Sequence, residues 1–527
     1  MLPWLVSLVG FSILSAATAA VNAAGLSHLK AAPHHLRTRS SVPADPPVKD
    51  GVEFPSYETV YTFDQLIDHT NPSLGTFKQR YYFTYEYYEQ GGPIILSTPG
   101  EEAMDGLALY VTNQTIAGII AQATKGAVVF LEHRYFGLSS PYPDLSEESL
   151  RFHTLEQAID DFVYFAKTAV LPMPGGDCVG ADTTPWLLFG GSYPGALVNW
   201  IMNAHPGVFW AGYSSSGVVE TISDYWSYYE PIRQNMPQNC SADIERVIEY
   251  VDQTFASGSS SDINALKARF GLSNVTHLDD AAYALSLPFR EWQERQPAAG
   301  PGDNFTRFCD ALEIKDGIAA SSDGWGLEHA IRAFGRYMRT VYLPYTCGDD
   351  SDIEACVGTY NRTLPRWTDT TVGNWVRSWQ WLLCNDLGFW MGGAPSSLPT
   401  LVSRLITPAY FNRQCSNYFP KAFPTDTSAD PKAQDVNAKY GGWNVTAPRV
   451  FFANGKRDPW REATVSSDSL SLASTELNPI AVSDGYHCND MLVANAIDPT
   501  IARVQELAIQ YFTQWVNDFQ SRSASSA

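Results

Sequence analysis

Residues 186–198 read WLLFGGSYPGALV, and this stretch decides the fold. The apolar residues before Gly190 predict a buried strand, the glycines predict a tight turn, and the residues after Pro194 begin a helix. The turn carries one serine, Ser192. A hydroxyl on such a turn projects from the end of a strand, so the surroundings of Ser192 decide what it can do.

Apolar strands and helices alternate on both sides of this stretch. The predicted strands cover 59–63, 78–85, 94–97, 127–131, 208–213, 449–454 and 478–483, and the predicted helices cover 155–169 and 500–519. Continuous apolar strands that alternate with helices are typical of a mostly parallel sheet with helices on both faces. Together with a serine on a strand–turn–helix, they predict an α/β-hydrolase core.

A second region interrupts the strand pattern from about Val219 to Asn444. Its segments 243–255, 280–287 and 326–341 predict helices, which glycine, tryptophan and cysteine interrupt. We therefore expect an α/β-hydrolase domain built from residues 51–218 and 445–527. Residues 219–444 are expected to form a large helical cap domain inserted after the serine.

The N-terminal residues predict export from the cell. Residues 1–20 are apolar and end in small residues, which predicts a signal peptide cleaved between about residues 19 and 24. A membrane anchor is the alternative, but the run is short for a span. Residues 21–50 predict a disordered leader or pro-segment, and order is expected from near Tyr57. The expected location is extracellular, with the vacuole or lysosome as the alternative.

The composition excludes some partners. The 527 residues carry a net charge of -21, and non-specific nucleic-acid binding needs a basic face instead. No later apolar stretch is long enough to span a bilayer, so no membrane partner is expected. The oligomeric state is left open between a monomer and a homodimer.

Cysteines and glycosylation sequons both fit a secreted protein. The eight cysteines contain no C-x-x-C pair, so disulfides are expected rather than a zinc site. Pairing of neighbours in order would join Cys240 to Cys309, Cys347 to Cys356 and Cys384 to Cys415, and whether Cys178 and Cys488 are free is left open. The sequons are Asn113, Asn239, Asn274, Asn304, Asn361 and Asn444.

A serine hydroxyl needs a base to take its proton, and the base needs an acid to orient it. In α/β-hydrolases the order along the chain is serine, acid, histidine. Asp458 follows the strand predicted at 449–454, and His487 lies in a loop before the last helix. We therefore expect Ser192 as nucleophile, His487 as general base and Asp458 as orienting acid. Asp484 and Asp490 are alternative acids, and the chemistry needs neither a metal nor another cofactor.

Pro194 departs from the G-x-S-x-G pattern, which has glycine at that position. Proline is tolerated in the first turn of a helix because its missing N–H would be unpaired there. The oxyanion donor after the nucleophile is the amide of Tyr193, which is intact. The second donor is expected at Gly100 or Glu101, and loss of one such donor costs about 3–4 kcal/mol in barrier.

Several short stretches resemble one family of serine peptidases. They are QLIDH at 65–69 with TFKQRY at 76–81, TPGE at 98–101, EHRYFG at 132–137 with SSP at 139–141, GGSY at 190–193, NG at 454–455 with DPW at 458–460, and Gly485 with His487. They resemble the lysosomal prolyl carboxypeptidase and dipeptidyl-peptidase family, especially its secreted fungal acid prolyl endopeptidases. The resemblance extends from about residue 60 to the last helix.

The resemblance implies an α/β-hydrolase core with a helical cap, and cleavage of proline-containing peptides or proteins on the carboxyl side of proline, often at acidic pH. It implies the same triad, and a role for Trp460 in a pocket for the proline ring, for which core packing is the alternative. Glu101 would either meet the substrate amino end or buttress its turn. His133 and Arg134 are expected to be structural.

Three other functions remain open. An exopeptidase of the same family would remove dipeptides, tripeptides or single carboxy-terminal residues. A lipase or carboxylesterase would use the same fold on esters, because a fold does not fix a substrate. A non-catalytic binding protein would retain the fold without the reaction.

Overall fold

The computed structural model describes residues 42–43, 45–49, 51–348, 352–424 and 431–526. The predicted signal peptide and most of the predicted leader lie outside the described residues. A small hairpin comes first, in which β1 (Val48–Lys49) pairs with β2 (Val52–Glu53). Regular structure therefore begins before Tyr57, the position from which the sequence led us to expect order.

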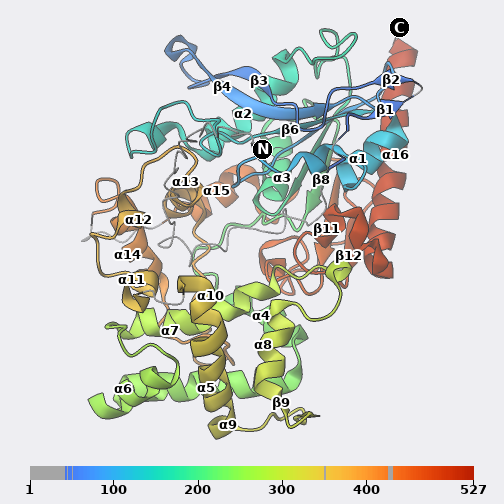
Figure 1. Ribbon diagram of the computed structural model, residues 1–527. Coiled ribbons are helices and arrows are strands. Elements are labelled where there is room, and N and C mark those ends of the chain that lie inside the picture. The colour runs from blue at the N-terminus through green and yellow to red at the C-terminus, as the bar shows by residue number, and fades with distance from the viewer. Residues whose placement is uncertain (1–41, 44, 50, 349–351, 425–430, 527) are drawn as a thin grey trace, which may run out of the picture.

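One eight-stranded sheet has the order β12-β11-β8-β7-β5-β6-β4-β3 (Figure 1). Its strands are β3 (Tyr61–Leu66), β4 (Thr76–Thr84), β5 (Ile94–Ser97), β6 (Ala127–Leu131), β7 (Trp186–Gly191), β8 (Ala211–Ser215), β11 (Val450–Gly455) and β12 (Ile480–Ser483). β4 is antiparallel to both of its neighbours, β3 and β6. The other six strands, β6, β5, β7, β8, β11 and β12 in sheet order, run parallel to one another. The carboxyl ends of these parallel strands therefore share one edge.

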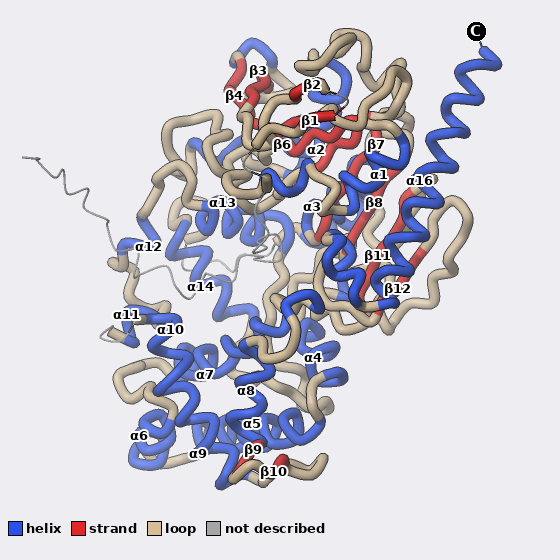
Figure 2. The backbone as a smooth tube through the Cα atoms, turned by 45° about the vertical axis from the view of Figure 1, so that its right-hand side comes forward, coloured by secondary structure: helices blue, strands red, loops and turns tan. Residues whose placement is uncertain are grey.

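Helices cover both faces of this sheet. α1 (Ile116–Thr124) and α16 (Pro499–Ser526) pack on one face, and α2 (Leu155–Thr168) and α3 (Tyr193–Ala204) pack on the other (Figure 2). Alternate residues of a strand point to opposite faces. Accordingly, Leu188 of β7 joins the core beneath α2 and α3, and Phe189 joins the core beneath α1 and α16.

This is the α/β-hydrolase fold, so the predicted fold class is confirmed. The strands predicted at 94–97 and 127–131 coincide with β5 and β6. The strand predicted at 208–213 begins later, at Ala211, because residues 206–210 form a turn. The last helix is longer than predicted and begins at Pro499, which fits the first turn of a helix.

The segment between β8 and β11 is mostly helical and lies below and to the left of the sheet in Figure 1. Its helices are α4 (Tyr229–Asn235), α5 (Gln238–Ser257), α6 (Ser260–Arg269), α7 (Leu278–Ser286), α8 (Asn304–Glu313), α9 (Leu327–Tyr337), α10 (Leu343–Cys347), α11 (Ile353–Val357), α12 (Pro365–Thr368), α13 (Trp375–Leu382), α14 (Pro408–Tyr418) and α15 (Ala433–Tyr440). One short hairpin, β9 (Ile314–Lys315) with β10 (Ile318–Ala319), interrupts them. We call this segment the cap.

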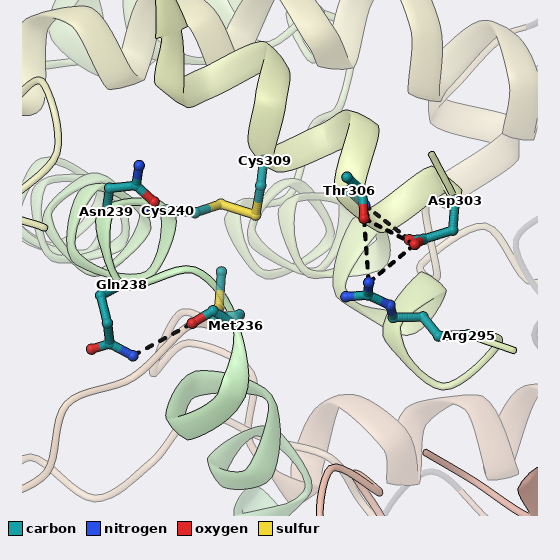
Figure 3. Close-up of a disulfide and its surroundings, with 8 residues drawn as sticks. All are labelled: Met236, Gln238, Asn239, Cys240, Arg295, Asp303, Thr306 and Cys309. Carbon is teal, nitrogen blue, oxygen red and sulfur yellow. Dashed lines mark hydrogen bonds and ion pairs between the residues drawn. A yellow bond between two sulfur atoms is a disulfide. The ribbon is translucent and has the colours of Figure 1, made fainter. Parts of the chain in front are cut away.

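Three disulfides cross-link the cap. Cys240 of α5 is bonded to Cys309 of α8, as Figure 3 shows, and the other two bonds join Cys347 to Cys356 and Cys384 to Cys415. All three predicted pairings are confirmed. Cys178 is a free, exposed thiol and Cys488 is a free, buried one.

The sequon asparagines differ in exposure. Asn113, Asn274, Asn304, Asn361 and Asn444 are exposed, whereas Asn239 is half-buried within α5. Among the residues that the structure describes, no helix is both long enough and apolar enough to cross a membrane.

Candidate active site

The turn between β7 and α3 holds Ser192 in a backbone conformation that is rare outside glycine, with φ 65° and ψ -127°. Its N–H donates to the carbonyl of Ser215, at 2.9 Å, which ties the turn to β8. A Cβ on Gly190 would lie 2.2 Å from the carbonyl oxygen of Pro194, so only glycine fits there. The strand and helix thus approach closely around the serine, as in a nucleophile elbow.

Pro194 lies in the first turn of α3, as the sequence predicted. The turn after β5 packs against its ring, because a Cβ on Gly100 would lie 2.4 Å from Pro194 Cγ. The same Cβ would lie 3.6 Å from Cδ1 of the Tyr193 ring, so the Gly100 turn lies beside the start of α3. The N–H of Gly100 donates to Thr98 Oγ1 at 3.2 Å. Because this N–H is already bonded within its own turn, the second oxyanion donor remains a prediction at either Gly100 or Glu101.

Asp458 and His487 form a buried pair at the ends of β11 and β12. His487 Nδ1 lies 2.9 Å from Asp458 Oδ1 and 3.1 Å from Oδ2, and both side chains are essentially inaccessible to solvent. An imidazole whose Nδ1–H donates to a carboxylate keeps Nε2 as its basic nitrogen. The geometry is therefore that of an oriented general base.

The two alternative acids are placed differently. The carboxylate of Asp490 accepts hydrogen bonds from Tyr213 Oη at 2.6 Å and Ser215 Oγ at 2.9 Å, and burial raises the pKa of Asp490 to about 6. The backbone N–H of Asp484 donates a hydrogen bond to Thr500 Oγ1 at 2.8 Å, near the start of α16. Asp458 is the acid that the structure pairs with the histidine.

The serine turn and the histidine loop are in contact. A Cβ on Gly191 would lie 3.0 Å from Cys488 Sγ, and the N–H of Cys488 donates to Ser216 Oγ at 3.0 Å. Burial raises the pKa of the Cys488 thiol well above its usual value, so the thiol stays protonated and acts as packing. The structure thus brings the three predicted residues to one edge of the sheet.

Trp460 forms one wall of a cleft that Ser192 also lines. Its ring stacks on Tyr225 at 5.4 Å and meets the rings of Tyr228 and Phe389 edge-on. Its backbone N–H donates to Asp458 Oδ1 at 2.8 Å. Trp460, the predicted pocket wall, and Asp458, the predicted acid, are therefore joined directly by a hydrogen bond.

The cap supplies most of the other walls of this cleft. Gln293 Oε1 accepts hydrogen bonds from Trp460 Nε1 at 2.7 Å and from Tyr228 Oη at 3.1 Å, which fixes both rings. The cleft is lined further by Tyr283, Arg290, Glu294, Trp375, Val376, Trp379, Gln380, Leu383, Trp390, Met391, Phe411 and Gln414. None of these residues was identified from the sequence, because no local spacing marks a cap residue as facing the serine.

Glu101 lines the same cleft, and only 3% of it is exposed. Its Oε2 has no hydrogen-bond partner among the described residues, and burial raises the pKa of Glu101 to about 8. A carboxyl in this state is neutral in acid and is available to a ligand in the cleft. The arrangement is compatible with both predicted roles of Glu101.

His133 and Arg134 brace the site from behind. His133 Nδ1 lies 2.8 Å from the carbonyl oxygen of Arg134, and its Nε2 lies 3.1 Å from Tyr193 Oη. Burial lowers the pKa of His133 to about 4, so the ring is neutral and Nε2 accepts from the tyrosine. The Arg134 guanidinium forms a buried ion pair with Asp161, with Nε–Oδ2 at 2.6 Å.

Among the residues that the structure describes, no group of three or more histidine, cysteine or acidic side chains is arranged to hold a metal ion.

Comparison with known proteins identifies the family. The sequence profile of the family described as serine carboxypeptidase S28 matches residues 65–507. The chain is 37% identical to serine protease vicPb of Bipolaris victoriae, over 88% of this chain and 90% of that protein. It is 32% identical to the "Probable extracellular serine carboxypeptidase" of Arthroderma benhamiae, over 78% of this chain and 59% of that protein. It is 24% identical to the lysosomal Pro-X carboxypeptidase of Mus musculus, over 90% and 92% of the two chains.

The fold and the paired Asp458 and His487 define an α/β-hydrolase with a serine on its nucleophile turn. The chain belongs to the serine carboxypeptidase S28 family and is a serine-type peptidase that acts on peptides.

Proposed function

We propose that this peptidase is secreted and cleaves peptide bonds on the carboxyl side of proline, in an acidic medium. The aromatic cavity beside Ser192 carries the proposal. The ring of proline is rigid and apolar and has no N–H to satisfy, so walls such as Trp460 and Phe389 suit it. The name of the mouse relative, lysosomal Pro-X carboxypeptidase, supports the same preference.

The proposed reaction passes through an acyl-enzyme. Ser192 Oγ attacks the carbonyl carbon of proline while His487 Nε2 takes its proton. The amide of Tyr193 and a second donor, Gly100 or Glu101, stabilise the oxyanion. His487 then gives the proton to the leaving amine, and the C–N bond breaks. Water, deprotonated by His487, hydrolyses the ester and regenerates Ser192, while Asp458 holds the imidazole in place.

Buried carboxyls support work in acid. Burial raises the pKa of Glu101 to about 8 and that of Asp490 to about 6, so both are neutral in an acidic medium. Ionising either one inside the protein has a desolvation cost that a neutral carboxyl avoids. The net charge of -21 also falls in magnitude as carboxylates are protonated, which reduces self-repulsion.

Replacement of the nucleophile tests the mechanism. Ser192→Ala is expected to abolish turnover of a proline anilide and labelling by a fluorophosphonate, while the unfolding transition stays intact. Ser73→Ala, on an exposed turn, is the matched control. Retained turnover in Ser192→Ala would show that the nucleophile is assigned wrongly.

Substrate choice separates the remaining candidates. Faster hydrolysis of a p-nitrophenyl acyl ester than of the proline anilide would favour an esterase, and absence of fluorophosphonate labelling would favour a binding protein. Digestion of a long peptide with one internal proline, read by mass, distinguishes internal cleavage from stepwise loss of terminal pieces.

A further inference from the structure

A second groove meets the active-site cleft at Glu294. It has a volume of about 910 Å³, near the upper end of the range of about 300–1,000 Å³ for ligand-binding clefts. Its walls come from three segments that are far apart in the sequence: residues 109–114, residues 291–307 and residues 492–495. Glu294 lines both this groove and the cleft that contains Ser192. The two spaces therefore adjoin at one side chain.

The groove lies on the histidine side of the nucleophile. Asn495, which lines it, donates from Nδ2 to the carbonyl of Asn489 at 2.9 Å and to Gln296 Oε1 at 2.7 Å. Asn489 Oδ1 in turn accepts from the N–H of Tyr486, next to His487. In acyl transfer the histidine protonates the leaving amine, so the leaving segment departs on its side. The groove is thus placed to receive the carboxyl-side part of a substrate.

Glu294 differs from the other acids of the groove in having no protein partner. Asp303 forms an ion pair with Arg295 at 3.1 Å, as Figure 3 shows, and Glu291 accepts from Asn304 Nδ2 at 2.9 Å. Within the described part of the chain, the half-buried side chain of Glu294 makes no hydrogen bond or ion pair. Burial raises its pKa well above the usual range, and nearby Glu291 and Glu102 raise it further.

None of the cations described nearby forms an ion pair with Glu294. Arg290, which lines the active-site cleft, donates from Nη2 to Tyr283 Oη at 2.5 Å, and its buried Nε has no hydrogen-bond partner among the described residues. Arg307 lies on the α8 wall of the groove. On the cleft side, Glu101 Oε2 is buried and has no hydrogen-bond partner among the described residues. Glu294 and Glu101 are therefore two carboxyls of the cleft that form no ion pair with another described residue.

We propose that this groove binds the leaving segment of the peptide substrate, and that Glu294 selects a lysine or arginine side chain within the first few residues after the scissile bond. The inference rests on the proposed peptidase mechanism. A substrate cation lowers the pKa of Glu294 and supplies the ion-pair partner that this carboxyl lacks, whereas an acidic residue or a free α-carboxylate keeps Glu294 protonated and gains no ion pair. Release of a single carboxy-terminal residue is accordingly disfavoured relative to cleavage further from the end of the chain.

The test uses internally quenched peptides with one internal proline and the full-length protein. Lysine, glutamine or glutamate is placed in turn at the second, third and fourth positions after proline, and kcat/KM is measured. At one position at least, lysine is expected to exceed glutamate by about tenfold or more, the scale of one hydrogen bond to a charged group. Equal cleavage of the lysine and glutamate peptides by the wild-type protein would refute the proposal without any variant.

Two variants locate the effect. Glu294→Gln is expected to reduce the lysine preference to about twofold while the glutamine peptide is still cleaved. Arg307→Gln, which removes the opposite charge from the same groove, is the matched control and should leave the lysine preference undiminished. An unchanged preference in Glu294→Gln would assign the selectivity to another residue and overturn the inference. If no proline peptide is cleaved by the wild-type protein, the proposed function itself fails, and this inference fails with it.

Discussion

Gly100→Ala tests whether the turn after β5 positions the oxyanion site. The added Cβ would lie 2.4 Å from Pro194 Cγ and 2.7 Å from Cδ, whereas ordinary contacts begin at 3.4 Å. The turn must therefore move by about 1 Å, and a displacement of that size at a positioned group costs on the order of 10²-fold in rate. The φ of 69° adds about 1–2 kcal/mol of backbone strain for alanine.

The expected result is a fall in kcat/KM on a proline anilide by about 100-fold. The free energy of unfolding, measured by denaturant titration, should fall by about 1–2 kcal/mol from the strain. The double variant Gly100→Ala/Pro194→Ala removes Cγ and Cδ of the ring, so the overlap disappears while the strain stays. It is expected to regain about tenfold or more of the lost activity without regaining stability.

Two results would refute this reasoning. A Gly100→Ala protein with the wild-type kcat/KM would show that the turn does not hold an oxyanion donor. A double variant no faster than the single one would show that the contact with Pro194 does not set the position of the turn.

Three further predictions concern the acid, the pocket and the pH dependence. Asp458→Asn should lower kcat by about 10⁴-fold with the fold intact, because an amide stabilises the wrong histidine tautomer; a loss below about tenfold in single-turnover kinetics would exclude this role. Trp460→Ala should reduce kcat/KM for proline by about tenfold or more relative to alanine at the same position, and an unchanged ratio would move the proline pocket elsewhere. The free energy of unfolding should fall as pH rises from about 6.5 to about 8, because Glu101, whose pKa is raised to about 8, stays protonated when folded and ionises when unfolded. Glu101→Gln should flatten this slope in thermal melts. Below about pH 6.5 the effect of Glu101 is opposed by buried His133: its pKa is lowered to about 4, so the unfolded histidine binds a proton that the folded one does not, and this contribution to stability rises with pH.

Much of the core of the fold is local in origin and was predictable. An apolar run bounded by turn residues is buried as a strand wherever it lies, so β5 and β6 coincide with their predicted ranges. The three disulfides join neighbouring cysteines, as predicted, although no physical rule of sequence excludes the other connectivities.

The pairing of acid and base was predictable for a different reason. In a parallel sheet the carboxyl ends of the strands share one edge, so residues that follow β11 and β12 must lie near each other. The sequence placed Asp458 and His487 after those strands, and the structure sets them 2.9 Å apart. It also explains why Asp490 is not the partner, since Tyr213 and Ser215 hold its carboxylate.

By itself, the sequence determined the serine turn, the order of serine, acid and histidine, and the hydrolase core. Strand burial and turn chemistry depend on local residue patterns, and the order of strands and helices along the chain follows from those patterns. The tertiary structure alone decided which cap residues face the serine. Gln293, Tyr228 and Phe389 contact Trp460 from segments up to about 230 residues away, through packing that no spacing encodes. The same packing left Glu294 without a partner between two cavities, which no property of its sequence neighbours could have indicated.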